Sequence, residues 1–196
     1  MIRFLIGFKR SHPGLWEVVE KVNGFLFRLF FGNISKKADM ILAGQGVAGC
    51  SFATVQKSDL DSLKHFLDKQ PKDYLEWFDP HDFDLKTLER LFKNPAFLMM
   101  KVCSDSGEMV GYFFLRSFFV GRSFAGLLVD RDWQNRGIGS QIWHLQSQIC
   151  KSCGLKMRAT ISTDNKPSIA SCRKGTSMTE LQKLENGYIA VECKTE

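Results

Sequence analysis

The sequence lacks long hydrophobic runs. No stretch of about 18 uncharged apolar residues occurs in its 196 residues, which argues against a membrane-spanning helix. Proline is scarce, with five residues, and no low-complexity segment occurs, which excludes a collagen-like or disordered chain. Only five residues separate Arg3 from Lys9, too few for the apolar region of a signal peptide. We therefore expect a cytoplasmic protein whose six cysteines are reduced thiols.

Positive charge is present but unevenly distributed. The chain carries a net charge of +6, with +4 in residues 1–45 and +6 in residues 131–175, and the remaining segments are net acidic. Such concentrated charge indicates a site for an anionic group, and either nucleic acid or a phosphate-bearing cofactor would suit it. Because no basic–aromatic motif or recognisable nucleic-acid-binding module occurs, we expect no nucleic-acid partner.

The order of hydrophobic patterns predicts the fold class. After residue 46, apolar runs typical of strands alternate with segments of helical spacing, which favours an α/β fold with a mixed sheet and helices on its faces. The length suits one compact domain. The predicted strands span residues 51–56, 97–103, 109–119, 123–129, 156–162 and 187–193, and the predicted helices span residues 59–70, 85–93, 137–153 and 166–174.

Residues 1–45 are predicted to form an N-terminal helical extension, followed by the main domain at residues 46–196. Apolar residues recur at helical spacing from Leu15 to Phe31, with a start signal at His12-Pro13-Gly14. Two interpretations stay open. The helix packs on the main domain, or it is a basic amphipathic segment that makes a weak contact with a membrane surface.

The chemically informative stretch is the one in which Gly137-Ile138-Gly139 opens an amphipathic helix directly after a strand and a polar loop. The first turn of a helix has unpaired backbone N–H groups and a partial positive charge, and glycine lets an anion approach the backbone closely. Arg131 and Arg136 add full charges nearby, so a pyrophosphate is the expected guest. Because Ile142 stands where the dinucleotide-binding motif needs a third glycine, that motif is not matched.

The stretch Gln134-Asn135-Arg136-Gly137-Ile138-Gly139 resembles, without a gap, the Gln/Arg-x-x-Gly-x-Gly/Ala signature of the GNAT superfamily of N-acetyltransferases. The strand ending at Val129 and the asparagine Asn165 after residues 156–162 are similar to that family too, and the resemblance covers roughly residues 50–193. It implies a mixed central sheet, splayed between the strand ending at Val129 and the strand 156–162, with helices on both faces. Acetyl-CoA, as co-substrate, would lie in the wedge.

The resemblance also implies a set of site residues. Expected to bind the cofactor are Leu128, Val129, Gln134, Arg136, Gly137, Gly139, Ser140 and Asn165. The implied chemistry is direct attack of an amine on the thioester, which needs a base, an amide that binds the oxyanion and an acid for the leaving thiolate. Many relatives carry tyrosine as that acid seven residues after the asparagine, where this sequence has Cys172. A thiol beside Arg173 and Lys174 could donate the proton, or the CoA thiolate leaves unaided and Cys172 is a packed core residue.

The loop from Trp77 to Phe83 is predicted to form the acceptor side. Its Trp77, Asp79 and His81 suit a cationic or hydroxylated acceptor, and His81 titrates near neutral pH. The loop resembles Phe-x-Pro-His-x-Phe loops of GNAT-like proteins linked to surface-polysaccharide assembly, which implies an amino sugar or a nucleotide-linked amino sugar. His81 and Asp130 are the base candidates. The alternatives are an exposed bystander for His81 and a loop-capping acid for Asp130.

The sequence predicts no metal cofactor, because Cys150 and Cys153 form half of a metal clip without a second pair. The leading prediction is therefore an acetyl-CoA-dependent N-acetyltransferase that acts on a small-molecule amine. The alternative is a catalytically degenerate GNAT-like acyl-CoA-binding module with a regulatory or interaction role. The acceptor, the acyl-chain preference, the general acid and base, and assembly as a homodimer stay open.

Overall fold

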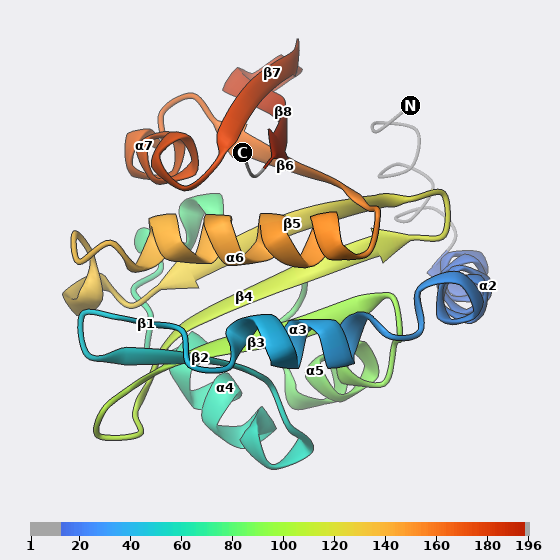
Figure 1. Cartoon of the computed structure of the whole chain (residues 1–196), viewed down its shortest axis with the longest axis horizontal. Coiled ribbons are helices and arrows are strands. Elements are labelled where there is room, and N and C mark those ends of the chain that lie inside the picture. Colours follow the sequence, from blue (N-terminus) through green and yellow to red (C-terminus); the bar gives the residue numbers. More distant parts are fainter. Residues whose placement is uncertain (1–12, 195–196) are drawn as a thin grey trace.

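The computed structural model describes residues 13–194 and shows one mixed sheet of eight strands with helices on both faces (Figure 1). The strand order is β1-β2-β3-β4-β5-β6-β8-β7. The strands are β1 (Gly46–Val47), β2 (Cys50–Thr54), β3 (Phe97–Ser104), β4 (Met109–Phe118), β5 (Arg122–Val129), β6 (Lys156–Ser162), β7 (Ser177–Lys183) and β8 (Tyr188–Lys194). The fold class predicted from the sequence is confirmed.

The helices divide between the two faces of the sheet. They are α2 (Pro13–Phe31), α3 (Ile34–Leu42), α4 (Leu60–Asp68), α5 (Leu85–Phe92), α6 (Ile138–Ser152) and α7 (Lys166–Gly175), with short 3₁₀ turns η1 (Lys57–Asp59), η2 (Tyr74–Trp77), η3 (Arg131–Trp133) and η4 (Glu185–Gly187). Helices α3 and α6 share one hydrophobic cluster with the sheet, and α4 and α5 share a second cluster with its other face. Within residues 13–194, no helix is both long and apolar enough to cross a membrane.

Helix α3 was not predicted, and it ties the N-terminal segment to the main core. Its inward face, Ile34, Ala38 and Leu42, is buried in the same cluster as the core residues of α6. The nine-residue segment has only three such positions, and Met40 and Ile41 beside them are apolar too, so its helical period is hard to recognise. The domain boundary at residue 45 stays a prediction, and residues 1–12 of the predicted extension lie outside the described residues.

Helix α2 contacts the domain, but not through the apolar stripe that its sequence displays. Asn23 donates to the Ser117 carbonyl at 3.0 Å and accepts from the Phe119 N–H at 3.1 Å. Glu20 pairs with Arg116 on β4 at 2.6 Å and with an arginine of α5 at 2.8 Å. The side chain of Phe27, on the same inward side of α2, is buried in the main hydrophobic cluster. The helix thus packs on the main domain, while the apolar stripe itself faces outward.

Candidate functional site

The two central strands separate at one end of the sheet. Strands β5 and β6 run parallel, and their register holds for three residue pairs only, ending at Phe124 and Arg158. Beyond that point β5 continues to Val129 against β4, and β6 continues to Ser162 against β8. The facing edges of β5 and β6 therefore diverge into a wedge, as the sequence resemblance implied.

The β5 edge of the wedge offers backbone groups that no strand uses. The Asp130 N–H donates to the Val110 carbonyl of β4 at 2.8 Å. Because peptide groups alternate along a strand, those of Leu128 also face β4, while those of Val129 and Leu127 face the wedge. The peptide groups of Val129 and Leu127 are therefore placed to meet a cofactor arm, whereas those of Leu128 are turned toward β4. Pairing of the Leu128 and Val129 backbones with the arm stays a prediction.

The glycine-rich loop brings the N-terminus of α6 to the same end of β5. Gly137 caps the helix with a φ of +83°, a conformation that glycine adopts without strain. The Gln141 N–H donates to the Gly137 carbonyl at 3.0 Å, so the intrahelical bonds begin there. The N–H groups of Ile138, Gly139 and Ser140 therefore point out of the helix end, where the macrodipole places partial positive charge.

Helix α7 lies against this first turn of α6. A Cβ on Gly139 would lie 3.4 Å from the Cβ of Ser171, and Trp143 donates to the Ser171 hydroxyl at 3.2 Å. Asn165 begins α7 by accepting the Ser168 N–H at 3.0 Å. The structure thus brings Asn165 and the glycine loop to neighbouring elements, while a cofactor contact for Asn165 stays a prediction.

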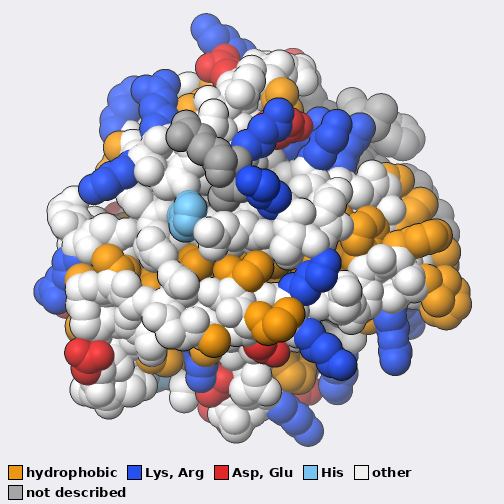
Figure 2. All heavy atoms as spheres, viewed as in Figure 1, with side chains coloured by type: hydrophobic (Ala, Val, Ile, Leu, Met, Phe, Trp, Pro, Cys, Tyr) orange, Lys and Arg blue, Asp and Glu red, His pale blue; other side chains and the backbone are white. Residues whose placement is uncertain are grey.

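The charge and shape at the loop fit a pyrophosphate. Arg136 is exposed, donates to the Asp132 carbonyl at 3.1 Å, and stacks on Trp133 with 4.5 Å between its guanidinium carbon and the ring centroid. These contacts hold its charge beside the free N–H groups of α6. Over the upper part of the view in Figure 2, around α7 and the β6–β8 end, Lys and Arg side chains gather as well. In residues 13–194, no group of three His, Cys, Asp or Glu residues could hold a metal ion.

Asp130 ends β5 as a paired and capped carboxylate. It accepts from the Asp132 N–H at 3.0 Å and from Gln70 at 3.1 Å, and it pairs with Lys69 at 3.0 Å. Burial acts to raise its pKa, but the three donors outweigh burial and hold the pKa below its ordinary value. These contacts are typical of a loop-capping acid and do not support a role as general base. That role of Asp130 stays a prediction.

His81 lies in the predicted acceptor loop but is turned inward. Its Nδ1 faces the Asp82 carbonyl at 2.9 Å, so Nδ1 carries the proton, and Nε2 accepts from the Tyr112 hydroxyl at 3.1 Å. The rings of Phe97 and Phe114 lie edge-on to the imidazole. Burial lowers the pKa of His81, which keeps the ring neutral at pH 7. The loop residues Trp77 and Asp79 are exposed.

The lowered pKa of His81 predicts acid sensitivity of the fold. A histidine whose pKa is lower in the folded state gives stability that is fully present above the unfolded pKa of about 6.5 and is lost as pH falls through the folded pKa. We expect the denaturant concentration at the unfolding midpoint to decrease as the pH is lowered from about 6.5. The His81→Gln variant should have a flatter profile. An unchanged profile in that variant would place the acid sensitivity elsewhere.

Comparison with known proteins identifies the family. The sequence matches the Acetyltransferase (GNAT) family over residues 61–175, more than half of the chain. The chain belongs to this family. A comparison with curated protein sequences found no match.

Solved structures of GNAT proteins share the fold. The GNAT domain of S. lividans PAT has a TM-score of 0.64 at 14% identity, over 73% of this chain and 89% of that chain. The spermidine N-acetyltransferase from Vibrio cholerae in complex with CoA and spermine gives 0.57 at 11% identity, over 74% and 94%. The aminoglycoside acetyltransferase AAC(6')-Ib in complex with coenzyme A and kanamycin gives 0.59 at 14% identity, over 74% and 94%.

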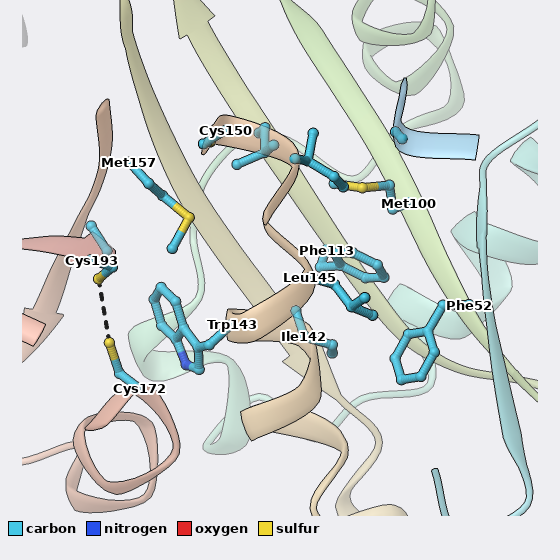
Figure 3. Close-up of a cluster of buried hydrophobic side chains, with 14 of the residues drawn as sticks. Phe52, Met100, Phe113, Ile142, Trp143, Leu145, Cys150, Met157, Cys172 and Cys193 are labelled. Atoms are coloured by element: carbon cyan, nitrogen blue, oxygen red, sulfur yellow. Dashed lines mark hydrogen bonds between the residues drawn. The ribbon is translucent and has the colours of Figure 1, made fainter. Parts of the chain in front are cut away.

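At the position where the GNAT resemblance implies an acid, Cys172 is fully buried. Its sulfur lies 3.4 Å from that of Cys193 on β8 and 3.7 Å from the Thr176 hydroxyl, and Figure 3 shows the two thiols directed at each other beside Trp143. The hydrogen bond between the thiols lowers the pKa of Cys172 and raises that of Cys193. The contacts are those of a core residue, so its catalytic role stays a prediction without a supporting contact.

The sequence analysis missed Tyr74, which lies at the wedge of this GNAT fold. Tyr74 belongs to η2 and donates its hydroxyl to the Val129 carbonyl at 2.5 Å. Burial raises its pKa, although a hydrogen bond with Gln134 acts in the other direction. The hydroxyl is therefore protonated at pH 7. Only a weak signal in the sequence indicates a role of Tyr74, because it is one of three tyrosines and lies beside an acidic segment that was predicted to be a loop.

Proposed function

We propose that this GNAT protein is an acetyl-CoA-dependent N-acetyltransferase that acetylates a small-molecule amine. The observation that carries the proposal is the divergence of β5 from β6 after three residue pairs, at the same end as the glycine-capped N-terminus of α6. Bound acetyl-CoA supplies an acetyl group activated as a thioester. Both the CoA arm and the pyrophosphate then have backbone donors of this chain to meet them.

We assign the binding roles as follows. The N–H groups of Ile138, Gly139 and Ser140, with the Arg136 charge, bind the pyrophosphate. The wedge-facing N–H and carbonyl of Leu127 and the N–H of Val129 pair with the extended arm, as a further strand would, while the Val129 carbonyl accepts from Tyr74. Gln134 hydrogen-bonds Tyr74 and so orders the inner end of the wedge.

The acceptor in this proposal is a cationic amine, with an amino sugar or a nucleotide-linked amino sugar as the favoured type. Residues 73–84 contain five acids, namely Asp73, Glu76, Asp79, Asp82 and Asp84, and all five are exposed. Trp77 is 40% exposed in the same loop and offers a face on which a sugar or a cation can stack. Relatives in complex with spermine, a polyamine, and kanamycin, an aminoglycoside, support a positively charged acceptor, because both molecules carry several amino groups.

We further propose that the proton donor near the reacting end is the Tyr74 hydroxyl rather than the Cys172 thiol. Proton donation by a positioned side chain contributes about 100-fold or more to a rate. Tyr74→Phe should therefore lower kcat about 100-fold with the Kd for acetyl-CoA nearly unchanged, whereas Cys172→Ala should leave kcat within about threefold. Steady-state kinetics on both variants compares the roles. A large loss in Cys172→Ala with none in Tyr74→Phe would reverse the assignment.

The buried position of Cys172 favours a second candidate function. Without an acid at that position, the chain would be an acyl-CoA-binding module with a regulatory or interaction role. Such a module would bind acetyl-CoA but would release no thiol with any amine.

Isothermal titration with acetyl-CoA tests the feature common to both functions. We expect one site per chain with a micromolar Kd. Absence of heat at hundreds of micromolar acetyl-CoA would reject the proposed cofactor site and with it both functions.

A further inference from the structure

Helix α2 packs on the domain with its apolar stripe exposed to solvent. Val18, Val22, Phe25 and Leu29 recur at intervals of four, three and four residues and therefore share one face of the helix. Their exposed fractions are 52%, 52%, 64% and 65%. The side that faces the domain contains the polar Glu20 and Asn23 with their hydrogen bonds and ion pairs, together with the buried Phe27. The helix therefore has a second apolar face that the domain does not cover, and a contiguous exposed apolar surface of this kind marks an interaction site.

The apolar surface continues beyond the helix onto the turn between β4 and β5. Phe119 and Val120 in that turn are 43% and 62% exposed, and the Phe119 N–H is bonded to Asn23 of α2. A groove of about 260 Å³ between the helix and the turn is lined by Val18, Val22 and Phe119 among others. We call the stripe and the turn together the α2 face; it comprises Val18, Val22, Phe25, Leu29, Phe119 and Val120. In Figure 2, hydrophobic side chains gather at the right-hand side, where Figure 1 places α2.

The charges beside the α2 face are positive. Lys21 and Arg28 are exposed on one flank of the stripe, and Arg122 is exposed directly after the turn. Glu20 is turned toward Arg116 and Arg90, so its charge is paired within the domain. The sequence that leads into α2, residues 1–12, adds Arg3, Lys9 and Arg10 and contains no acid.

We propose that the α2 face docks this protein on an anionic lipid surface. Apolar side chains flanked by lysine and arginine match the boundary between acyl chains and anionic headgroups, where long cationic side chains reach the phosphates. A second copy of the chain fits less well. Pairing two α2 faces about a two-fold axis would bring Lys21 and Arg28 of each copy together, and none of the described side chains on the stripe, from Val18 to Leu29, is an acid that could neutralise them.

The position of the α2 face is compatible with turnover on a membrane. The face lies at the start of β5, whereas the glycine loop follows the end of β5, and the eight residues between them span about 26 Å at about 3.3 Å per residue. Figure 1 shows α2 and the loop before α6 at opposite ends of the sheet. Docking would therefore leave the wedge open to acetyl-CoA from water.

Vesicle flotation with the full chain tests the proposal. We expect binding to vesicles of phosphatidylcholine with phosphatidylglycerol, and about tenfold weaker binding to phosphatidylcholine alone or at high salt. The double variant Phe25→Glu/Leu29→Glu should lose at least about tenfold in binding, because both side chains insert in the proposed pose. Leu181→Glu, at an exposed apolar position on β7, should bind like the wild type.

Two further measurements keep the proposal separate from folding and from the proposed function. The double variant should keep the wild-type melting temperature and Kd for acetyl-CoA, because neither side chain is buried or near the loop. Equal flotation of the wild type and the double variant would overturn the proposal. So would a wild-type dimer in sedimentation that the double variant splits and that does not bind vesicles. Loss of acetyl-CoA binding in the wild type would instead count against the proposed function alone.

Discussion

Replacing Gly139 by aspartate should weaken CoA binding about 100-fold, a loss of about 2.7 kcal/mol. The new carboxylate would stand in the first turn of α6, where the proposed pyrophosphate meets the free N–H groups, and like charges repel. The side chain would also occupy the narrow space beside Ser171, whose Cβ lies 3.4 Å from the position of a Cβ on Gly139. Titration calorimetry with CoA measures the loss.

The same substitution should not harm the fold, which separates binding from stability. An acid in the first turn of a helix interacts favourably with the macrodipole, so the melting temperature should stay the same or rise. Gln148→Asp adds the same carboxylate about two and a half turns further along α6 and should change the CoA Kd by less than about threefold. Equal losses in the two variants would show that CoA does not bind at the glycine loop.

Gly175→Ala should destabilise the protein by about 3 kcal/mol, near the upper end of the usual cost of overpacking. Gly175 ends α7, and a Cβ there would lie 2.2 Å from the Ser140 carbonyl oxygen and 2.9 Å from the Trp143 Cβ. Backbone atoms of α6 cannot rotate away, so α7 must shift outward. For a chain of this size, the melting temperature should fall by about 10 °C. Because Ser140 belongs to the first turn of α6, CoA affinity should fall too.

Gly46→Ala is the matched control for this prediction. Its Cβ would meet only the Cys50 carbonyl oxygen, at 3.2 Å, on an exposed strand. We expect a change of less than about 1 kcal/mol there. If Gly175→Ala were as mild as Gly46→Ala, the close approach of α7 to α6 would be wrong.

The elements between residues 51 and 174 were predictable because each carries its own pattern. Strands β3 and β4 are buried apolar runs joined by a polar turn, and α6 has an apolar stripe ended by glycine. Strand β7 has no such pattern. It lies at the edge of the sheet with six of its seven residues exposed, so its sequence does not alternate. Its pairing with β8 alone makes it a strand, and single-sequence patterns do not show pairing.

The candidate site was predictable where backbone geometry defines it and not where side chains do. The glycine loop was found because glycine, arginine and a helix start must follow one another in sequence. The directions of Leu128 and Val129 depend on register with β4, which the sequence leaves open. The side-chain contacts at the site join residues that are distant in sequence, which single-sequence patterns do not show. The pairs are His81 with Tyr112, Asp130 with Lys69, Cys172 with Cys193, and Tyr74 with Val129.

The α2 stripe shows a related limit of periodicity. Helical spacing predicts that apolar residues share a face, and α2 confirms this. It does not predict which face meets the domain. Here Glu20 and Asn23 decide that, through partners on β4 and α5 that lie about 70 to 100 residues away.

The most direct test of the account is turnover with acetyl-CoA and a panel of amines, including polyamines and amino sugars. Release of the free CoA thiol is followed by a colorimetric thiol assay, and the masses of the amine products are measured by mass spectrometry. We predict that thiol is released only when a cationic amine is present and that one acetyl group is added to its nitrogen. The Gly139→Asp variant should show neither thiol release nor acetylated amine. Tight binding of acetyl-CoA with no thiol release for any amine would contradict the enzyme and leave the binding module in its place.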